Sequence, residues 1–79
     1  MADLRFKTLF FRLYDRKIAD GTTTFSQTGI KKSDFTRLCV EDGYVFDDET
    51  IIKACEAMKL FPEEREMLLE LAAKERKEG

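Results

Sequence analysis

The chain of 79 residues contains no histidine and no tryptophan, and it has only one proline and two cysteines. Histidine is the commonest general base near neutral pH, so its absence removes the usual residue for acid–base catalysis. Cys39 and Cys55 lie far apart and form no CxxC pair, so they do not provide the ligand set of a structural zinc site. Both have apolar neighbours and are expected to be buried and inert. We therefore expect no metal and no cofactor.

Sequence motifs of enzymes and of membrane or secreted proteins are also missing. There is no GxSxG, no phosphate-binding glycine loop and no dinucleotide fingerprint, and the carboxylates are dispersed rather than paired among apolar residues. We therefore expect no catalytic residues and no enzymatic activity. No apolar run approaches the roughly 20 residues that a membrane span needs, and the first residues lack the layout of a secretory signal. These absences predict a cytoplasmic protein that does not contact a membrane.

The chain has an ordinary apolar content of 43% and a high charged content of 38%. A chain of this length is too short for two buried cores, so residues 1–79 are expected to form one domain. The net charge is only −2, but the charges are unevenly distributed. Residues 1–38 carry eight bases and four acids, whereas residues 39–79 carry six bases and twelve acids. The basic half is suited to attract phosphates.

Apolar residues recur at steps of three and four, which predicts an all-α protein with short loops. Five helices are expected, near residues 4–19, 23–28, 32–42, from 47 or 48 to an interruption at 60–62, and 62–77. Gly21 should end the first helix and Gly43 the third. In the third, Ser33 is the expected N-cap, while Phe35, Leu38 and Cys39 should point inward.

The segment around Gly29 has the pattern of a helix-turn-helix. A glycine permits a sharp turn between two short helices, and Ile30 provides an apolar plug beyond it. The run 24–38, TFSQTGIKKSDFTRL, resembles the helix-turn-helix of the lambda-repressor-like, XRE-type regulators of bacteria and phages. The positions that match are Gly29, Ile30, Ser33, Phe35, Thr36, Arg37 and Leu38. Residues 60–72 are similar to the end of that domain, so the resemblance covers about residues 4–72.

This resemblance implies a compact five-helix lambda-repressor-like domain whose third helix reads the major groove of double-stranded DNA. It further implies a homodimer on a palindromic operator. The implied DNA-binding residues are Thr23, Thr24, Gln27, Lys31, Lys32, Ser33, Asp34, Thr36 and Arg37. The expected dimer interface comprises Phe61, Met67, Leu68, Leu69 and Leu71. For Met67, Leu68 and Leu71, packing into the core of the monomer is an equally good interpretation.

Two functions follow from these observations. The first is a sequence-specific transcriptional regulator, a small phage or mobile-element repressor of autoregulatory, antitoxin-like or anti-CRISPR-associated type. The second is a small helical protein–protein interaction module, for example an anti-CRISPR-like phage inhibitor, that keeps the scaffold without binding DNA. The basic half of the chain favours the first function. Asp34, Glu41 and Asp42 favour the second, because their negative charge falls near the expected position of DNA phosphates.

Overall fold

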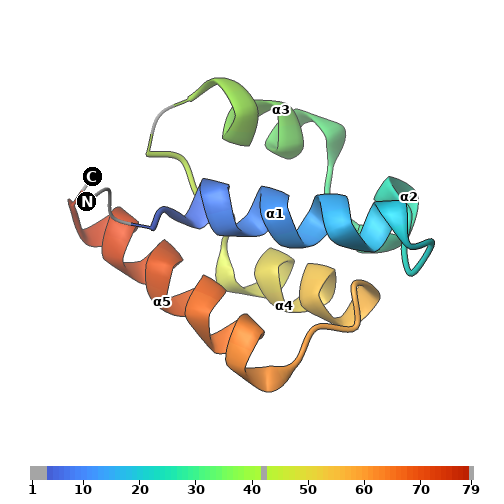
Figure 1. The fold of residues 1–79 in the computed structure, drawn as a ribbon. Helices are drawn as coiled ribbons and strands as arrows, with labels where there is room; N and C mark the ends of the chain where they lie inside the picture. The colour runs from blue at the N-terminus through green and yellow to red at the C-terminus, as the bar shows by residue number, and fades with distance from the viewer. Residues whose placement is uncertain (1–3, 42, 79) are drawn as a thin grey trace.

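The computed structural model describes residues 4–41 and 43–78, and within these ranges it contains five helices and no strand (Figure 1). The helices are α1 (Phe6–Ala19), α2 (Phe25–Thr28), α3 (Lys32–Val40), α4 (Asp48–Ala57) and α5 (Pro62–Glu78). The expected all-helical class and the order of the five helices are thus confirmed. None of the helices in the described part of the chain is long and apolar enough to cross a membrane.

The core forms along the apolar stripe of α1. Phe6 and Phe10 of α1 are almost fully buried, at 0% and 1% exposure, and so is Phe46 in the connection before α4, at 1%. The ring of Phe46 stands edge-on to both, with centroid distances of 5.8 Å to Phe6 and 5.3 Å to Phe10. Aromatic rings prefer this edge-to-face arrangement. The connection before α4 therefore supplies a central core residue.

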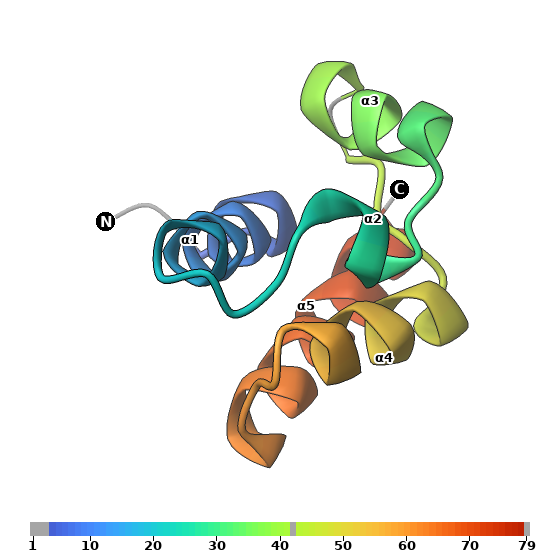
Figure 2. The same cartoon turned by 90° about the vertical axis from the view of Figure 1, so that its right-hand side faces the viewer.

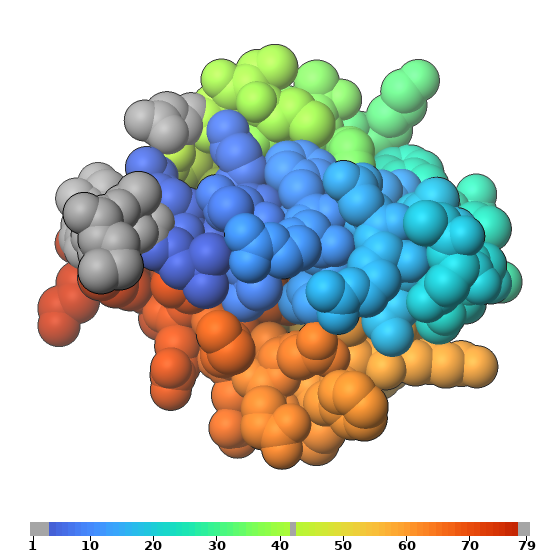
Figure 3. Space-filling view, viewed as in Figure 1, coloured from blue at the N-terminus to red at the C-terminus, as the bar shows by residue number. Residues whose placement is uncertain are grey.

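The helices are arranged around this core with α3 on its own side. The close helix pairs are α1 with α5, α4 with α5, and α2 with α4. Figure 2 shows α3 set apart from α4 and α5, and Figure 3 shows α1 crossing the molecule between α3 and α5. Contact of α3 with the rest of the molecule depends on Leu38, which is fully buried, and on Phe35, which is half-buried. The face of α3 opposite these residues is exposed.

Several helix boundaries differ from the predicted ones by two residues. The first helix begins at Phe6 rather than Leu4, and the second begins at Phe25 because Thr24 is its N-cap. The third ends at Val40, and Gly43 lies beyond it with a φ of 85°. The fourth is capped by Asp47, one of the two expected residues, whose side chain accepts a hydrogen bond from the Thr50 amide at 2.8 Å.

Two expectations about α3 are wrong. Ser33 is not the N-cap, because the helix has already begun at Lys32, and the cap position is occupied by Lys31, which makes no side-chain capping bond. Cys39 is exposed rather than buried, whereas Cys55 is buried as expected. The reason is that α3 lies against the body along one narrow side, so Leu38 fills the contact and the next residue already faces outward.

Candidate nucleic-acid interface

The turn between α2 and α3 has the predicted glycine geometry. Gly29 has a φ of 72°, in the left-handed region that glycine adopts without a steric cost. The Thr28 hydroxyl donates to the Phe25 carbonyl at 2.6 Å and accepts from the Ile30 amide at 3.3 Å. Ile30 is 5% exposed, as expected for an apolar plug. These contacts fix the direction in which α3 leaves the turn.

The beginning of α3 presents polar side chains to solvent. Lys31, Lys32 and Ser33 are all exposed, and Thr36 is exposed one helical turn after Ser33. Residues three apart on a helix lie on the same face, so Ser33 and Thr36 share one surface. No acidic loop covers this end of α3 in the described part of the chain. The two lysines and the two hydroxyls can therefore be reached by a large ligand.

The other end of α3 is occupied by a small network around Arg37. The Arg37 guanidinium donates to the Glu41 carboxylate at 2.8 Å and lies over the Tyr44 ring, 4.5 Å from its centroid. The hydrogen bond and charge of Glu41 raise the pKa of Arg37, and the same hydrogen bond lowers the pKa of Glu41. Burial, followed by the negative charge of Asp34, raises the pKa of Tyr44. Arg37 is exposed, but its guanidinium already has partners.

The two described acidic residues of α3 lie at different ends of the helix. Asp34 is half-buried on the side of α3 that faces Tyr44, and Glu41 is at the opposite end of the helix from Lys31. Asp42, the third acid that favoured an interaction module, lies outside the described residues. Negative charge is therefore present at both ends of α3, because Asp34 lies in its first turn, next to the two lysines, and Glu41 lies at its C-cap.

The α2 residues have mainly local roles. Thr24 and Gln27 form a capping box, in which the Thr24 hydroxyl accepts from the Gln27 amide at 3.4 Å and the Gln27 side chain accepts from the Thr24 amide at 3.1 Å. Both residues are exposed. Thr23, in contrast, is 2% exposed, and its hydroxyl donates to the Thr24 carbonyl. Thr23 therefore cannot reach a DNA backbone in this structure.

The residues expected at a dimer interface are divided between core and surface. Leu68 is fully buried in the monomer, and Leu69 and Leu71 are half-buried and pack against the core. Phe61 and Met67 are 68% and 44% exposed. The alternative interpretation, packing into the monomer core, therefore holds for Leu68 and partly for Leu71. Met67 faces solvent. Only Phe61 and Met67 of this set are exposed.

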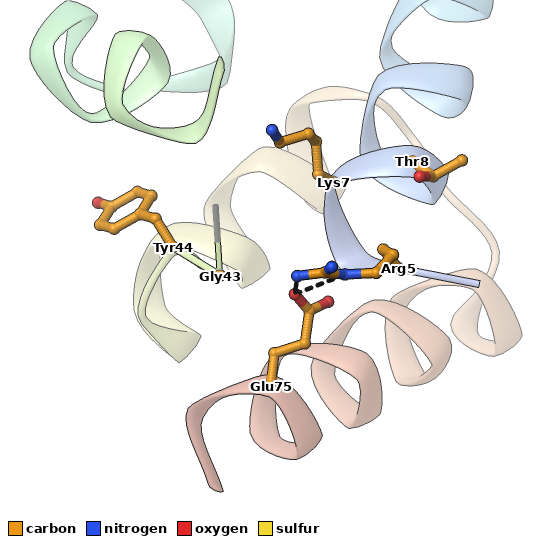
Figure 4. Close-up of a pocket in the computed structure, with 6 residues that line it drawn as sticks. All are labelled: Arg5, Lys7, Thr8, Gly43, Tyr44 and Glu75. Carbon is orange, nitrogen blue, oxygen red and sulfur yellow. Dashed lines mark hydrogen bonds and ion pairs between the residues drawn. The ribbon is translucent and has the colours of Figure 1, made fainter. Parts of the chain in front are cut away.

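A pocket of about 220 Å³ lies between the beginning of α1, the end of α5 and the segment before α4 (Figure 4). It is lined by Arg5, Lys7, Thr8, Gly43, Tyr44 and Glu75. The Arg5 guanidinium meets the Glu75 carboxylate at 3.0 Å, and the Lys7 ammonium donates to the Cys39 carbonyl at 3.4 Å. No buried side-chain polar atom of the described residues lacks a hydrogen-bond partner. We assign no ligand to this pocket.

Three contacts near these sites were not anticipated from the sequence. The capping box had a local signal, because Thr24 and Gln27 stand three residues apart before a helix. The contact of Arg37 with Tyr44 and the clamp between Arg5 and Glu75 join residues from different elements, and no pattern along the chain indicates them. A comparison of the chain with known protein families, curated proteins and solved structures finds no match.

Proposed function

We propose that this protein is a cytoplasmic, sequence-specific DNA-binding regulator of transcription that contacts duplex DNA through the beginning of α3. The observation that carries the proposal is the exposure of Lys31, Lys32 and Ser33 directly after the left-handed turn at Gly29. A major-groove reader needs a surface helix whose first residues are accessible and whose direction is fixed by the preceding turn. The α3 helix meets both requirements.

The contacts can be divided by chemistry. Lys31 and Lys32 are suited to DNA phosphates, which position a protein without reading sequence. Ser33 and Thr36 share a face and are suited to base edges, through hydroxyl hydrogen bonds and, for Thr36, through its methyl group on a thymine methyl. Asp34 is half-buried, so we assign it no base contact. Thr24 and Gln27 stabilise α2 and are exposed enough for a backbone contact.

Arg37 can join the DNA-contacting residues only if it exchanges Glu41 for a group on the DNA. Its pair with Glu41 is an exposed ion pair between residues four apart on one helix, with side chains 53% and 49% exposed. Such pairs contribute little to stability, so exchanging Glu41 for a phosphate or a guanine edge costs little. Small repressors read a palindromic operator with two copies of the protein. Each copy places α3 in one half-site, and the two half-sites are about 34 Å apart along the duplex.

The test is selection of bound sites from a random duplex library, followed by titration of the selected duplex by fluorescence anisotropy over a range of salt concentrations. We expect Lys32→Ala to weaken binding about fivefold to tenfold and to reduce the slope of log K against log salt by about one. Lys53→Ala is the control, because it removes an exposed lysine from α4. Failure to select any site, or equal effects of the two variants, would overturn the proposal.

The exposed apolar side chains favour one other candidate function, a protein-interaction module. Val40 at the end of α3 and Phe61 before α5 are 73% and 68% exposed. Large exposed apolar side chains are typical of protein contacts, although single ones are also common on ordinary surfaces. If no DNA site is selected, and Phe61→Ala abolishes the biological activity while Lys32→Ala does not, this second function replaces the first.

A further inference from the structure

The solvent face of α5 carries charges of opposite sign at its two ends. One side of the helix packs against α1 and α4, through buried residues such as Leu68 and Ala72. Figure 1 shows α5 at the edge of the molecule, so its other side is uncovered. The exposed stripe follows helical spacing and comprises Glu63, Glu66, Met67, Glu70, Ala73, Lys74 and Lys77. Its first half is acidic and its last part is basic.

Within residues 4–41 and 43–78, none of the five charged side chains of this stripe forms an ion pair. Glu70 and Lys74 stand four residues apart, a spacing that permits an ion pair on one helix, yet they do not pair. The helix dipole explains charges only in the first and last turns. Glu66, Glu70 and Lys74 lie between those turns, so the helix itself does not account for their order.

We propose that α5 is the contact face of a weak homodimer, in which two α5 helices pair antiparallel about a two-fold axis level with Glu70. In that register Glu63 lies level with Lys77 of the second copy, since each is seven residues from Glu70. Glu66 lies level with Lys74 of the second copy, four residues from Glu70. Met67 lies level with the small Ala73, three residues from Glu70. The two-fold axis repeats each of these pairs.

Charge complementarity selects a second copy of this chain as the partner. A single helix face that is acidic at one end and basic at the other complements itself only in the antiparallel orientation. The stripe from residue 63 to 77 is about 21 Å long, and its one large apolar side chain is Met67. Such a contact is small and mostly polar, so the dimer is weak and sensitive to salt. At the axis, Glu70 faces its own copy, and this repulsion weakens the dimer further.

The test is sedimentation equilibrium of the full chain without DNA, at protein concentrations up to about 1 mM and in about 50 mM and 500 mM salt. We expect a monomer–dimer equilibrium that weakens at the higher salt concentration. Glu66→Lys turns two attractive pairs into two repulsive ones and should weaken the dimer about tenfold. Glu70→Gln removes the central repulsion and should tighten it about threefold.

A charge exchange provides the sharpest control. The double variant Glu66→Lys/Lys74→Glu keeps the net charge and restores both pairs only in the antiparallel register, so it should recover dimerisation to within about threefold of the original. Glu56→Lys makes the same charge change on α4 and should have no effect, and circular dichroism checks that each variant remains helical. A monomer at every concentration, no recovery in the double variant, or an equal effect of Glu56→Lys would overturn the proposal. Because no DNA is present, these outcomes are independent of whether the chain binds DNA.

Discussion

At the scale of single residues, Phe35 joins α3 to the body of the molecule. Its ring stands edge-on to Phe11 and Phe25, with centroid distances of 5.5 Å and 5.2 Å, and is tilted against Tyr14 at 5.3 Å. Each such pair contributes about 0.5–1.5 kcal/mol beyond the area it buries. Phe11 is half-buried because it packs against this ring.

We expect Phe35→Ala to lower the free energy of unfolding by about 2–3 kcal/mol, less than for a fully buried phenylalanine because the ring is half-buried. Urea denaturation followed by circular dichroism measures this change. Phe61→Ala serves as the matched control and should cost less than about 0.5 kcal/mol, since that side chain is largely exposed. Equal losses in the two variants would show that the aromatic contacts do not hold α3.

The two cysteines differ in their environment and should differ in chemistry. Burial raises the pKa of the Cys55 thiol from 9.0 to about 11. The folded state therefore keeps this thiol protonated at a pH where the unfolded chain ionises it, so stability is lost as pH rises from about 9 to about 11. Cys39 is exposed and should react with a thiol reagent in the native protein, whereas Cys55 should react only after denaturation.

The measurement is the free energy of unfolding in urea between pH 8 and about 11. Tyr14 and Tyr44 also have raised pKa values, so the contribution of Cys55 is taken as the difference from Cys55→Ala. The original chain should lose stability more steeply than this variant across the window. Parallel pH profiles would contradict the assignment.

At the scale of the elements, the order of the helices follows from the sequence because apolar spacing, Gly21, Gly29 and Pro62 are local signals. The end of α1 and the turn after α2 follow from glycines in the left-handed region. The cap of α3 and the exposure of Cys39 could not be predicted in this way. Both depend on how α3 lies against α1, and that placement is determined by aromatic residues from three helices, α1, α2 and α3.

The turn between α2 and α3 permits a direct test. A Cβ added to Gly29 would meet no atom within 4 Å, so the effect of Gly29→Ala comes from the backbone alone. We expect a loss of about 1–2 kcal/mol in the free energy of unfolding, because alanine rarely adopts the left-handed conformation. Gly29→Asn should cost less, since asparagine tolerates that conformation better. Thermal and urea unfolding of both variants provide the comparison, and a larger loss for asparagine would refute the explanation.

At the scale of the whole molecule, the end of α5 clamps the beginning of α1. The Glu75 side chain is 10% exposed, accepts from the Phe6 amide at 2.6 Å, and pairs with Arg5 at 3.0 Å. Close by, Arg76 donates to the Phe46 carbonyl and pairs with Asp48 at 3.0 Å. These polar contacts tie α5 to α1 and to the beginning of α4.

We expect Glu75→Gln to lower the free energy of unfolding by about 1–2 kcal/mol, because it removes a negative charge from the amino end of α1 and the ion pair with Arg5. Glu70→Gln makes the same change on the exposed side of α5 and should alter stability by less than about 0.5 kcal/mol. Denaturation at low protein concentration keeps association out of the comparison. If the two variants lose the same stability, the clamp contributes nothing.

The candidate site was predictable to a smaller extent than the fold. The Gly29 turn, the Ile30 plug and the exposure of Lys31, Lys32 and Ser33 follow from local sequence. The burial of Thr23 and the engagement of Arg37 by Glu41 and Tyr44 do not, because they depend on side chains meeting across the folded chain.

The contact between Arg5 and Glu75 brings the two ends of the described chain together. A short glycine–serine linker joining the termini, with new ends opened between Asp20 and Gly21, would give a circular permutant in the order α2, α3, α4, α5, α1. Gly21 is exposed and has no neighbour within 4 Å of an added Cβ, so new ends there meet no steric obstacle. The cost of the opening is the hydrogen bonds that the Gly21 and Thr22 amides donate to the Ile18 and Lys17 carbonyls at the end of α1. The permutant should keep its helical content. The α1–α5 pair would become sequential neighbours, the mean contact separation would fall, and the chain should fold faster in stopped-flow experiments.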